Sequence, residues 1–549
     1  MSKNISHLSG RKGLEDNLFD RLGNLVQEDA RPSKDKLADL ADEFLVGTAN
    51  VYGTTTFYDF LKPENQGKKV YVCNGSVCLC AGTQDALREK LQGQFKEEEV
   101  GEMCCLGRCH ENSAFFYNGK NYSGSDADNL EDIVAGNGNN VDTYAAKATG
   151  QAVLTLPFEG MDAHYALLKA MLERNPEDVL QEIKQSGIRG RGGAGFPMGL
   201  KLEFCRKAEG DTKFIICNAD EGDPGAFSDR WIMEQRPHSL LFGMLAAGYV
   251  TGAEWGVVYI RAEYPESVDV IERAIQELRD NNLLGAKILG SDFSYDLKVI
   301  KAQGSYICGE ETALINSIEG QRPEVRVRPP YPAQEGLFMK PTVVNNVETL
   351  AALHYIIGNG ANAYSGLGTE NSTGTKLVSL DSRFRNPGIY EVEMGSPLSD
   401  VIFEHGGGFV EPVKALHIGG PLGGMVPLEM VDQLTVDFES FHQHGFLLGH
   451  ASVVSIPERF PLVEYLQHLF EFASDESCGK CFPCRLGTKR AEEMLHKAQH
   501  EGYKIEKQLF DDLLHTLEIG SLCAHGGGIP LPVRNAMQHF EGELAEYFA

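Results

Sequence analysis

The chain has 549 residues, a formal net charge of −28 and an ordinary globular composition, with 42% hydrophobic and 23% charged residues. A chain of this length exceeds one hydrophobic core, so we expect about three to five domains. The excess of carboxylates argues against nucleic-acid or anionic-membrane partners, because both require a basic face on the protein.

The first ten residues have no apolar signal-peptide core. The longest apolar stretch, 240–250, is interrupted by glycines and is too short to span a bilayer. We therefore expect a soluble, cytoplasmic protein. Thirteen cysteines in that compartment favour metal or redox use over disulfides.

The first 150 residues predict a helical segment at 1–60, a small domain at 61–136 and a polar, glycine-rich linker at 137–150. The elements expected here are helices at 14–27, 34–44 and 83–91, a strand at 69–72, and a hairpin through an Asn-Gly turn at 118–119. The β-α-β-β order, with cysteines after the first strand, predicts a thioredoxin-like domain.

Two cysteine pairs lie in the loops of this small domain: Cys73 and Cys78, then Cys105 and Cys109. Four thiolates can hold either zinc or a [2Fe–2S] cluster, so the ligand type alone does not decide. Structural zinc pairs usually enclose two residues, whereas these pairs enclose four and three. We therefore favour [2Fe–2S] and keep zinc as the alternative. Cys104 could replace Cys105, and Cys80 is interpreted as a small apolar filler.

From 151 to 372 strands and helices alternate, which predicts an α/β domain with a mainly parallel sheet. Within it, 190–195 contains four glycines in six residues, which allows main-chain N–H groups to approach a phosphate closely. The run fits G-x-G-x-x-G, but its strand, at 213–219, follows the glycines. We therefore predict a phosphate cradle of another kind, with a flexible glycine loop as the alternative.

The last third of the chain changes character twice. We predict a compact β-rich module at 373–452 and a helical bundle at 453–549. The bundle carries a second cysteine set, Cys478, Cys481, Cys484 and Cys523. Three thiolates at successive two-residue spacings, closed by a remote fourth, indicate a [4Fe–4S] cluster. His525 could tune this cluster, but we favour an ordinary, partly exposed histidine. The remaining thiols, Cys205, Cys217 and Cys308, are expected to be buried and structural.

The sequence resembles a fusion of the two NADH-oxidising subunits of respiratory complex I, the thioredoxin-like [2Fe–2S] subunit and the flavoprotein subunit. The motifs that carry the likeness are 190–197 with Lys201, 218–221, 306–312 and 345–349. The same module serves as the diaphorase subunit of soluble formate dehydrogenases and hydrogenases. The β-rich module is similar to the β-grasp insert of that family.

The resemblance implies sites for FMN and NADH. The expected FMN contacts are Gly190, Gly192, Gly193, Lys201, Asn218, Asp220, Glu221, Tyr306, Gly309, Glu310, Asn345 and Asn346. The expected NADH contacts are Phe196, Phe204, Asp223, Glu311 and Arg328, with the two phenylalanines around the adenine. The adjacent carboxylates of Glu310 and Glu311 would repel a 2′-phosphate and favour NAD over NADP. FMN performs the hydride transfer, so we predict no catalytic acid or base among the side chains.

Two departures from the complex I pattern are present. Asp223 stands where the complex I subunit usually has glutamate, and this shorter acid leaves the nicotinamide-side contact open. Ser228 precedes Asp229-Arg230 as in soluble formate dehydrogenases and hydrogenases, and the fusion of two subunits into one chain points the same way. We therefore expect the beta (diaphorase) subunit of a soluble NAD-dependent formate dehydrogenase, with a separate molybdenum or tungsten alpha subunit in a hetero-oligomer. The alternatives are the NADH-input subunit of complex I or of an NAD-reducing or bifurcating hydrogenase, and a non-catalytic, zinc-stabilised scaffold.

Overall fold

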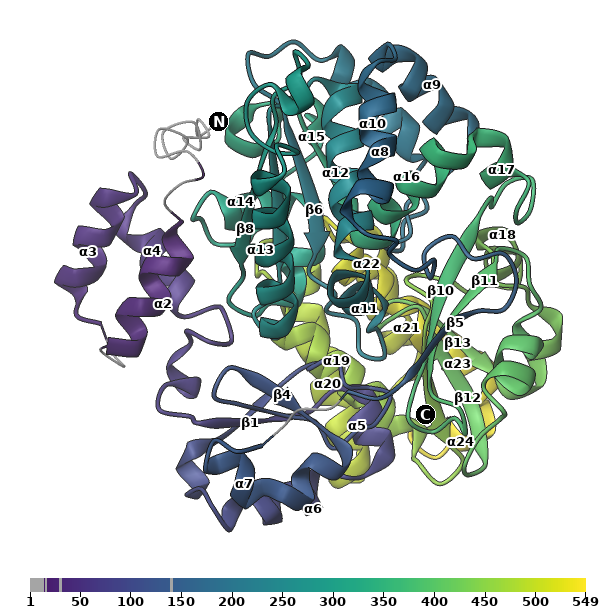
Figure 1. Ribbon diagram of the computed structural model, residues 1–549. Coiled ribbons are helices and arrows are strands. Elements are labelled where there is room, and N and C mark those ends of the chain that lie inside the picture. The colour runs from purple at the N-terminus through teal and green to yellow at the C-terminus, as the bar shows by residue number, and fades with distance from the viewer. Residues whose placement is uncertain (1–13, 15–16, 29–31, 139–141) are drawn as a thin grey trace.

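The computed structural model describes residue 14 and residues 17–28, 32–138 and 142–549 (Figure 1). Within these residues three sheets form, separated by helical layers. The predicted fold class is confirmed: a thioredoxin-like domain, an α/β domain, a β-rich module and a C-terminal group of helices follow one another along the chain.

The thioredoxin-like domain is built on a four-stranded sheet in the order β2-β1-β3-β4. Its elements are β1 (Val70–Cys73), α5 (Ser76–Ala81), α6 (Gln84–Gln92), β2 (Val100–Met103), β3 (Phe115–Tyr117), β4 (Lys120–Tyr122) and α7 (Leu130–Val134). Strand β1 runs parallel to β2 and antiparallel to β3. The hairpin turns at Asn118 and Gly119, which have φ of 49° and 73°. This left-handed backbone explains the Asn-Gly pair.

The N-terminal helices pack on the α/β domain. They are α2 (Leu18–Glu28), α3 (Lys34–Glu43) and α4 (Thr48–Thr55), at the left edge of Figure 1. Phe19 and Leu22 share a core with Ile216 and other residues of the central sheet. Tyr58, just after α4, lies with its hydroxyl 2.7 Å from Ser317 Oγ. This segment therefore covers one face of the central sheet.

Replacing Phe19 with alanine is expected to loosen this cover. The ring is fully buried and lies 5.0 Å from the ring of Tyr58, centroid to centroid. Truncating a buried phenylalanine costs about 3–5 kcal/mol, so α2–α4 should open more often. Hydrogen exchange across 18–55 measures the effect. Leu45→Ala is the matched control, since Leu45 is 43% exposed. Equal exchange in the two variants would contradict the packing role.

The central sheet consists of four parallel strands in the order β8-β7-β6-β9. The strands are β6 (Phe214–Ala219), β7 (Trp255–Ile260), β8 (Asp296–Lys301) and β9 (Thr342–Asn346). The chain places β7 and β8 on one side of β6 and then β9 on the other. The strand order therefore reverses between β6 and β9. In open parallel sheets such a switch point, at the carboxyl ends of the strands, forms the ligand-binding crevice.

Helices cover the second face of this sheet. They are α8 (Met161–Leu172), α9 (Pro176–Gln185), α10 (Met198–Lys207), α11 (Ser228–Gln235), α12 (Pro237–Thr251), α13 (Pro265–Asp280) and α16 (Val347–Asn359). The apolar stretch 240–250 lies in α12, where Gly243 allows close approach: a Cβ there would come within 2.0 Å of Leu350 O. No helix in the described part of the chain has the length and apolar composition that crossing a bilayer requires.

A six-stranded sheet, in the order β13-β12-β14-β10-β11-β5, forms the β-rich module. Its strands are β5 (Ala145–Ala148), β10 (Thr375–Leu380), β11 (Gly388–Glu393), β12 (Val413–Ile418), β13 (Gly424–Pro427) and β14 (Ser452–Pro457). Strand β5 lies inside the segment 137–150 that we predicted as a linker, and it pairs in parallel with β11. The sequence of β5 shows no alternation of apolar and polar residues that would predict a strand. It lies at the edge of the sheet, where main-chain hydrogen bonds to β11 hold it. The sheet also includes β14, which extends past 452.

The C-terminal helices are α19 (Leu462–Asp475), α20 (Phe482–His500), α21 (Lys507–Gly520), α22 (Ala524–Gly528), α23 (Pro530–His539) and α24 (Glu541–Leu544). Shorter helices elsewhere are α14 (Glu311–Ile318), α15 (Pro332–Glu335), α17 (Ala361–Ser365) and α18 (Phe438–Gln443). In Figure 1, α19 and α20 lie between the thioredoxin-like domain and the β-rich module. The cysteines of the second set lie at the start of α20 and just before α22.

Candidate functional site

The first cysteine set is assembled by the loops after β1 and β2. All four predicted ligands, Cys73, Cys78, Cys105 and Cys109, are buried. The thiols of Cys105 and Cys109 lie 3.4 Å apart, and the thiol of Cys73 contacts those of Cys78 and Cys105. Gly75 leaves room between them, since a Cβ there would lie 3.5 Å from two of the sulfurs. The four thiols therefore form one group.

The two neighbouring cysteines do not join this group in the same way. Cys80 is buried beside Arg459, which donates to its main-chain oxygen. Cys104 is only partly buried, and burial together with the charge of Cys105 raises its thiol pKa. Cys105, whose thiol receives a hydrogen bond from Gly107 N at 3.4 Å, remains the preferred ligand.

The four cysteines of the second set also lie close together, although Cys523 is remote in the sequence. Cys478 packs in a small apolar cluster with Ile307 and Val325, against which Cys523 lies. Cys484 lies close to Cys481 and Cys478, and burial raises its pKa to about 11. Buried thiols of this kind need a metal to become thiolates. The structure thus brings together the four ligands expected for a cubane cluster.

His525 differs from its prediction. We expected a partly exposed side chain, but it is 4% exposed, and its Nε2 lies 2.8 Å from Ala473 O. Burial lowers its pKa. The reason is tertiary: the turn that delivers Cys523 to α20 carries His525 under α19. Its ring centroid lies 5.7 Å from that of Tyr306.

The glycine loop crosses the carboxyl end of β9, beside the switch point. Gly192 lies against Asn346, where a Cβ would come within 3.0 Å of the Asn346 Cβ. Gly193 has φ +124° and faces open space, with no atom within 4 Å of a Cβ built there. A hydrogen bond from the main-chain N of Arg191 to Thr349 Oγ1, 2.8 Å long, fixes the loop to the start of α16. The result is an open main-chain cradle.

Two buried polar atoms beside the cradle lack partners among the described residues: Oδ2 of Asp220 and Nδ2 of Asn345. They lie at the carboxyl ends of β6 and β9, which are neighbours in the sheet. Gly309 closes the same edge, where Asn218 Nδ2 donates to its oxygen at 2.8 Å. Leaving a buried polar group unsatisfied costs about 1–3 kcal/mol. A bound group with both hydrogen-bond donors and acceptors is therefore expected here.

An acidic turn, 220–225, contacts the first cysteine set and approaches the second set through Tyr306. Asp220 begins it at the carboxyl end of β6, and Gly225 N donates to Cys109 Sγ at 3.3 Å. Asp223 is hydrogen-bonded to Tyr306, whose ring packs on His525 near Cys523. The cradle and the two cysteine sets therefore adjoin one another through six residues of the chain.

Three segments of the chain match known protein families. Residues 9–137 match the family described as thioredoxin-like [2Fe-2S] ferredoxin. Residues 183–355 match the Nuo51 FMN-binding domain, and 464–547 match the NADH-ubiquinone oxidoreductase-F iron-sulfur binding region. The chain is 40% identical over 393 residues to the F 2 subunit of the NADH-quinone oxidoreductase of Rhizobium meliloti (strain 1021), covering 71% of this chain and 93% of the relative. The chain belongs to the family of F subunits of NADH-quinone oxidoreductase.

Other relatives extend the likeness. The chain is 41% identical over 393 residues to the NADP-reducing hydrogenase subunit HndC of Solidesulfovibrio fructosivorans, covering 70% of this chain and 80% of that one. A solved NAD+-reducing [NiFe]-hydrogenase in the H2-reduced state contains a chain with a TM-score of 0.85 and 29% identity, covering 97% of this chain and 93% of its own. The predicted resemblance to a fused NADH-oxidising subunit is confirmed.

This member of the family is an NADH-oxidising flavin and iron–sulfur enzyme subunit, and its cofactors are FMN, [2Fe–2S] and [4Fe–4S]. The residues present fit these groups. The open main-chain cradle at Gly193 suits a phosphate, and the unpartnered atoms of Asp220 and Asn345 suit a polar ring edge. Two sets of four clustered thiols suit the two iron–sulfur centres. Zinc, kept as the alternative, has no support from the family descriptions.

The residues expected to hold NADH come from several elements: Phe196 precedes α10, Phe204 lies on it, Asp223 follows β6, Glu311 begins α14 and Arg328 precedes α15. Two of them are joined by ion pairs to the expected FMN contacts Lys201 and Glu310. Lys201 Nζ lies 3.0 Å from Glu311 Oε2 and donates to Val344 O at 3.0 Å. Arg328 pairs with Glu310 and lies 3.2 Å from Glu311 Oε1. Four predicted residues thus form one ion-pair network. Phe196 and Phe204 are 44% and 52% exposed, so both rings are open to a stacking partner.

Two predicted FMN contacts have their side chains engaged by the protein. Glu221 accepts from Asp229 N at 2.9 Å and Arg230 N at 3.0 Å, the first turn of α11. Tyr264, which the sequence did not single out, donates to the same carboxylate at 3.2 Å and packs on Gly107 between two cluster cysteines. Asn346 donates through its Nδ2 to Asp229 Oδ2 at 2.5 Å. These side chains support the turn and the cradle.

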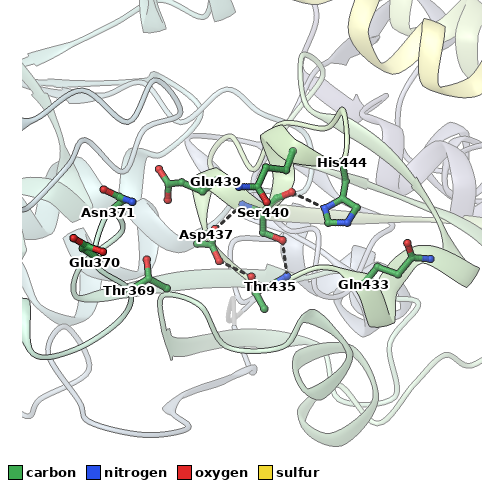
Figure 2. Close-up of a pocket in the computed structure, with 10 residues that line it drawn as sticks. Thr369, Glu370, Asn371, Gln433, Thr435, Asp437, Glu439, Ser440 and His444 are labelled. Atoms are coloured by element: carbon green, nitrogen blue, oxygen red, sulfur yellow. Dashed lines mark hydrogen bonds between the residues drawn. The ribbon is translucent and has the colours of Figure 1, made fainter.

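A separate polar hollow of about 420 Å³ lies at the edge of the β-rich module (Figure 2). Among its lining residues, Asp437 accepts from Ser440 N at 2.7 Å, and Glu439 accepts from Arg189 Nη1 at 2.6 Å. Arg189 directly precedes the glycine loop. Because Asp437 and Glu439 already have hydrogen-bond partners within the protein, we assign these side chains a structural role: Glu439 holds Arg189 next to the glycine loop.

Proposed function

We propose that this chain is the NAD(H)-linked diaphorase subunit of a larger cytoplasmic oxidoreductase. One observation carries the proposal: the acidic turn 220–225 adjoins the flavin cradle, the [2Fe–2S] thiols and, through Tyr306, the [4Fe–4S] region. When bound, FMN exchanges hydride with nicotinamide and single electrons with iron–sulfur clusters. The chain supplies the positioning that keeps all three centres together.

The proposed contacts follow the geometry. The glycine loop holds the FMN phosphate through main-chain N–H groups, and Asp220, Asn218, Asn345 and Gly309 border the ring. The exposed Phe196 and Phe204, with Asp223 and the network of Lys201, Glu310, Glu311 and Arg328, would hold NADH. The paired carboxylates favour NAD over NADP.

The partner that we propose is a molybdenum or tungsten formate dehydrogenase subunit. Ser228, which departs from the complex I pattern, and the fusion of two subunits into one chain support a soluble complex of this kind. A second candidate is a hydrogenase subunit. It is favoured by the solved NAD+-reducing [NiFe]-hydrogenase chain, whose likeness extends over 97% of this chain. Purifying the complex with its natural partners and assaying NAD reduction with formate and with hydrogen distinguishes the two. Activity with neither donor, despite NADH–viologen activity, argues against both.

The partner should contact the face around the [4Fe–4S] ligands. Four large apolar side chains are exposed there: Phe482 70%, Leu486 57%, Ile519 70% and Leu522 46%. Gly520 packs on Pro483, which joins the two segments into one patch. Cys481 and Cys523 are partly exposed within it. An apolar patch rimmed by polar residues is typical of a protein interface.

Phe482→Glu is therefore expected to weaken the partner complex. Loss of an exposed aromatic anchor costs about 2 kcal/mol or more, about 30-fold in affinity. Size-exclusion chromatography of the co-expressed complex measures it, with iron content checked to be unchanged. Val410→Glu serves as the control, since Val410 is 56% exposed on the β-rich module. An intact complex with Phe482→Glu would move the interface elsewhere.

A further inference from the structure

Three ionisable side chains from two distant parts of the chain meet beside the flavin cradle: Glu221 and Asp229 from one, and His450 from the other. They are 5%, 2% and 6% exposed. His450 Nε2 lies 3.2 Å from Asp229 Oδ2 and 3.8 Å from Glu221 Oε1. His450 directly precedes the positive-φ residue that leads into β14, so it belongs to the β-rich module, whereas the carboxylates belong to the α/β domain.

This group is connected to the glycine loop through one amide. Asn346 Nδ2 donates to Asp229 Oδ2 at 2.5 Å, and Asn346 Oδ1 accepts from Thr349 N at 3.3 Å. Both ends of the amide are therefore engaged. Gly192 packs against this side chain: a Cβ built at Gly192 would lie 3.0 Å from the Asn346 Cβ. A shift of Asp229 would move Asn346 and with it the loop.

The charges around His450 require a cation at this position. Asp229 and Glu221 face it directly, Asp223 lies near, and Lys376 is already paired with the buried Glu348. Burial, the largest single influence, lowers the pKa of His450. The charge and hydrogen bond of Asp229 together with the charge of Glu221 outweigh it, and the pKa is raised to about 9. Two buried carboxylates without a cation would repel each other and an adjacent phosphate.

A metal ion fits this group less well than a proton. Glu221 already accepts hydrogen bonds on both oxygens, from Asp229 N and Ser228 Oγ on one and from Arg230 N and Tyr264 on the other. These donors occupy the lone pairs that a metal would need. The group is therefore a hydrogen-bonded ionic cluster.

We infer that His450 is a positioning residue for the flavin: as an imidazolium it holds Asp229, and through Asp229 and Asn346 it fixes the glycine loop. The inference rests on the proposed position of FMN at that loop. It gives the β-rich module a part in cofactor retention, since this module supplies the one cation that faces both carboxylates directly among the described residues.

The cation makes retention depend on pH. A histidine whose pKa is raised in the folded chain contributes fully below its ordinary value and loses that contribution as the pH rises through about 9. FMN should therefore dissociate more readily above that pH. The charged hydrogen bond to a buried carboxylate predicts a weakening of about 10- to 100-fold.

Burial and the charge of Asp229 raise the pKa of Glu221 to about 7, so the test is made above that range. It measures FMN dissociation from the purified full chain by flavin fluorescence between pH 8 and pH 10. For His450→Gln we expect FMN binding at pH 8 that is weaker by about 10- to 100-fold and no longer changes between pH 8 and pH 10. Adding Asp229→Asn to His450→Gln removes the charge that needs the cation and should restore much of the affinity. His442→Gln, an exposed histidine of the same module, is the control.

Unchanged affinity and pH dependence in His450→Gln would overturn the inference. If that variant fails to fold, as judged by its iron content, Asp229→Asn alone provides the test: its FMN affinity should lose the pH dependence, and a retained dependence would overturn the inference. An equivalent of zinc or manganese that is lost with His450 would overturn it too. Equal FMN affinity in the wild-type chain and in Gly193→Val, whose glycine loop is altered, instead contradicts the proposed flavin site.

Discussion

Replacing Cys478 with serine is expected to remove the four-iron cluster while the two-iron cluster and FMN stay in place. Cys478 is buried and lies beside the other cysteines of its set, and a serine hydroxyl is a poor substitute for a thiolate ligand. Iron should fall from about six to about two atoms per chain, since the sites hold four and two. Iron and acid-labile sulfide analysis of anaerobically purified protein measures the loss.

The same variant should separate the two halves of the reaction. Reduction of bound FMN by NADH in a single turnover should persist, because the cradle and nucleotide residues lie on other elements. Electron delivery to the partner should fall by at least about tenfold, because the exit centre near the exposed patch is lost. Cys217→Ser is the matched control, since Cys217 is also buried but lies on β6. Full iron content in Cys478→Ser would contradict the ligand assignment.

Replacing Gly193 with valine is expected to remove FMN from the chain. Gly193 has φ +124°, a conformation that side chains of other residues rarely adopt, and valine is stiff at χ1. Strain of about 1–3 kcal/mol, which corresponds to about 5- to 150-fold in FMN affinity, should result. The valine would also fill the open space above the main-chain N–H groups. Equilibrium dialysis with flavin fluorescence measures the affinity.

Gly190→Ala is the control for that substitution within the same loop. A Cβ at Gly190 would make an ordinary contact, 3.6 Å from Phe196 O, and its φ is not positive. This variant should bind FMN about as tightly as the wild-type protein, with both variants retaining full iron. Equal affinity in Gly193→Val and Gly190→Ala would show that the loop does not cradle the phosphate.

The cluster ligands could be predicted from the sequence because cluster size restricts local spacing. Cys478, Cys481 and Cys484 are two residues apart in turn, and the structure groups them with Cys523. The glycine loop was also visible, since close main-chain approach to a ligand requires residues without a Cβ. The parallel strands of the central sheet followed from the alternation of apolar runs and helical periods.

The convergence of these sites could not be predicted, because it depends on contacts between residues far apart in the chain. Asp229 and His450 are separated by 221 positions and meet through the packing of two domains. Strand β5 has no apolar pattern and exists because β11 offers a free edge. The N-terminal helices cover the flavin-domain sheet, although they precede the thioredoxin-like domain. Residue spacing specifies chemistry within a loop, whereas burial and pairing across the fold decide which loops meet.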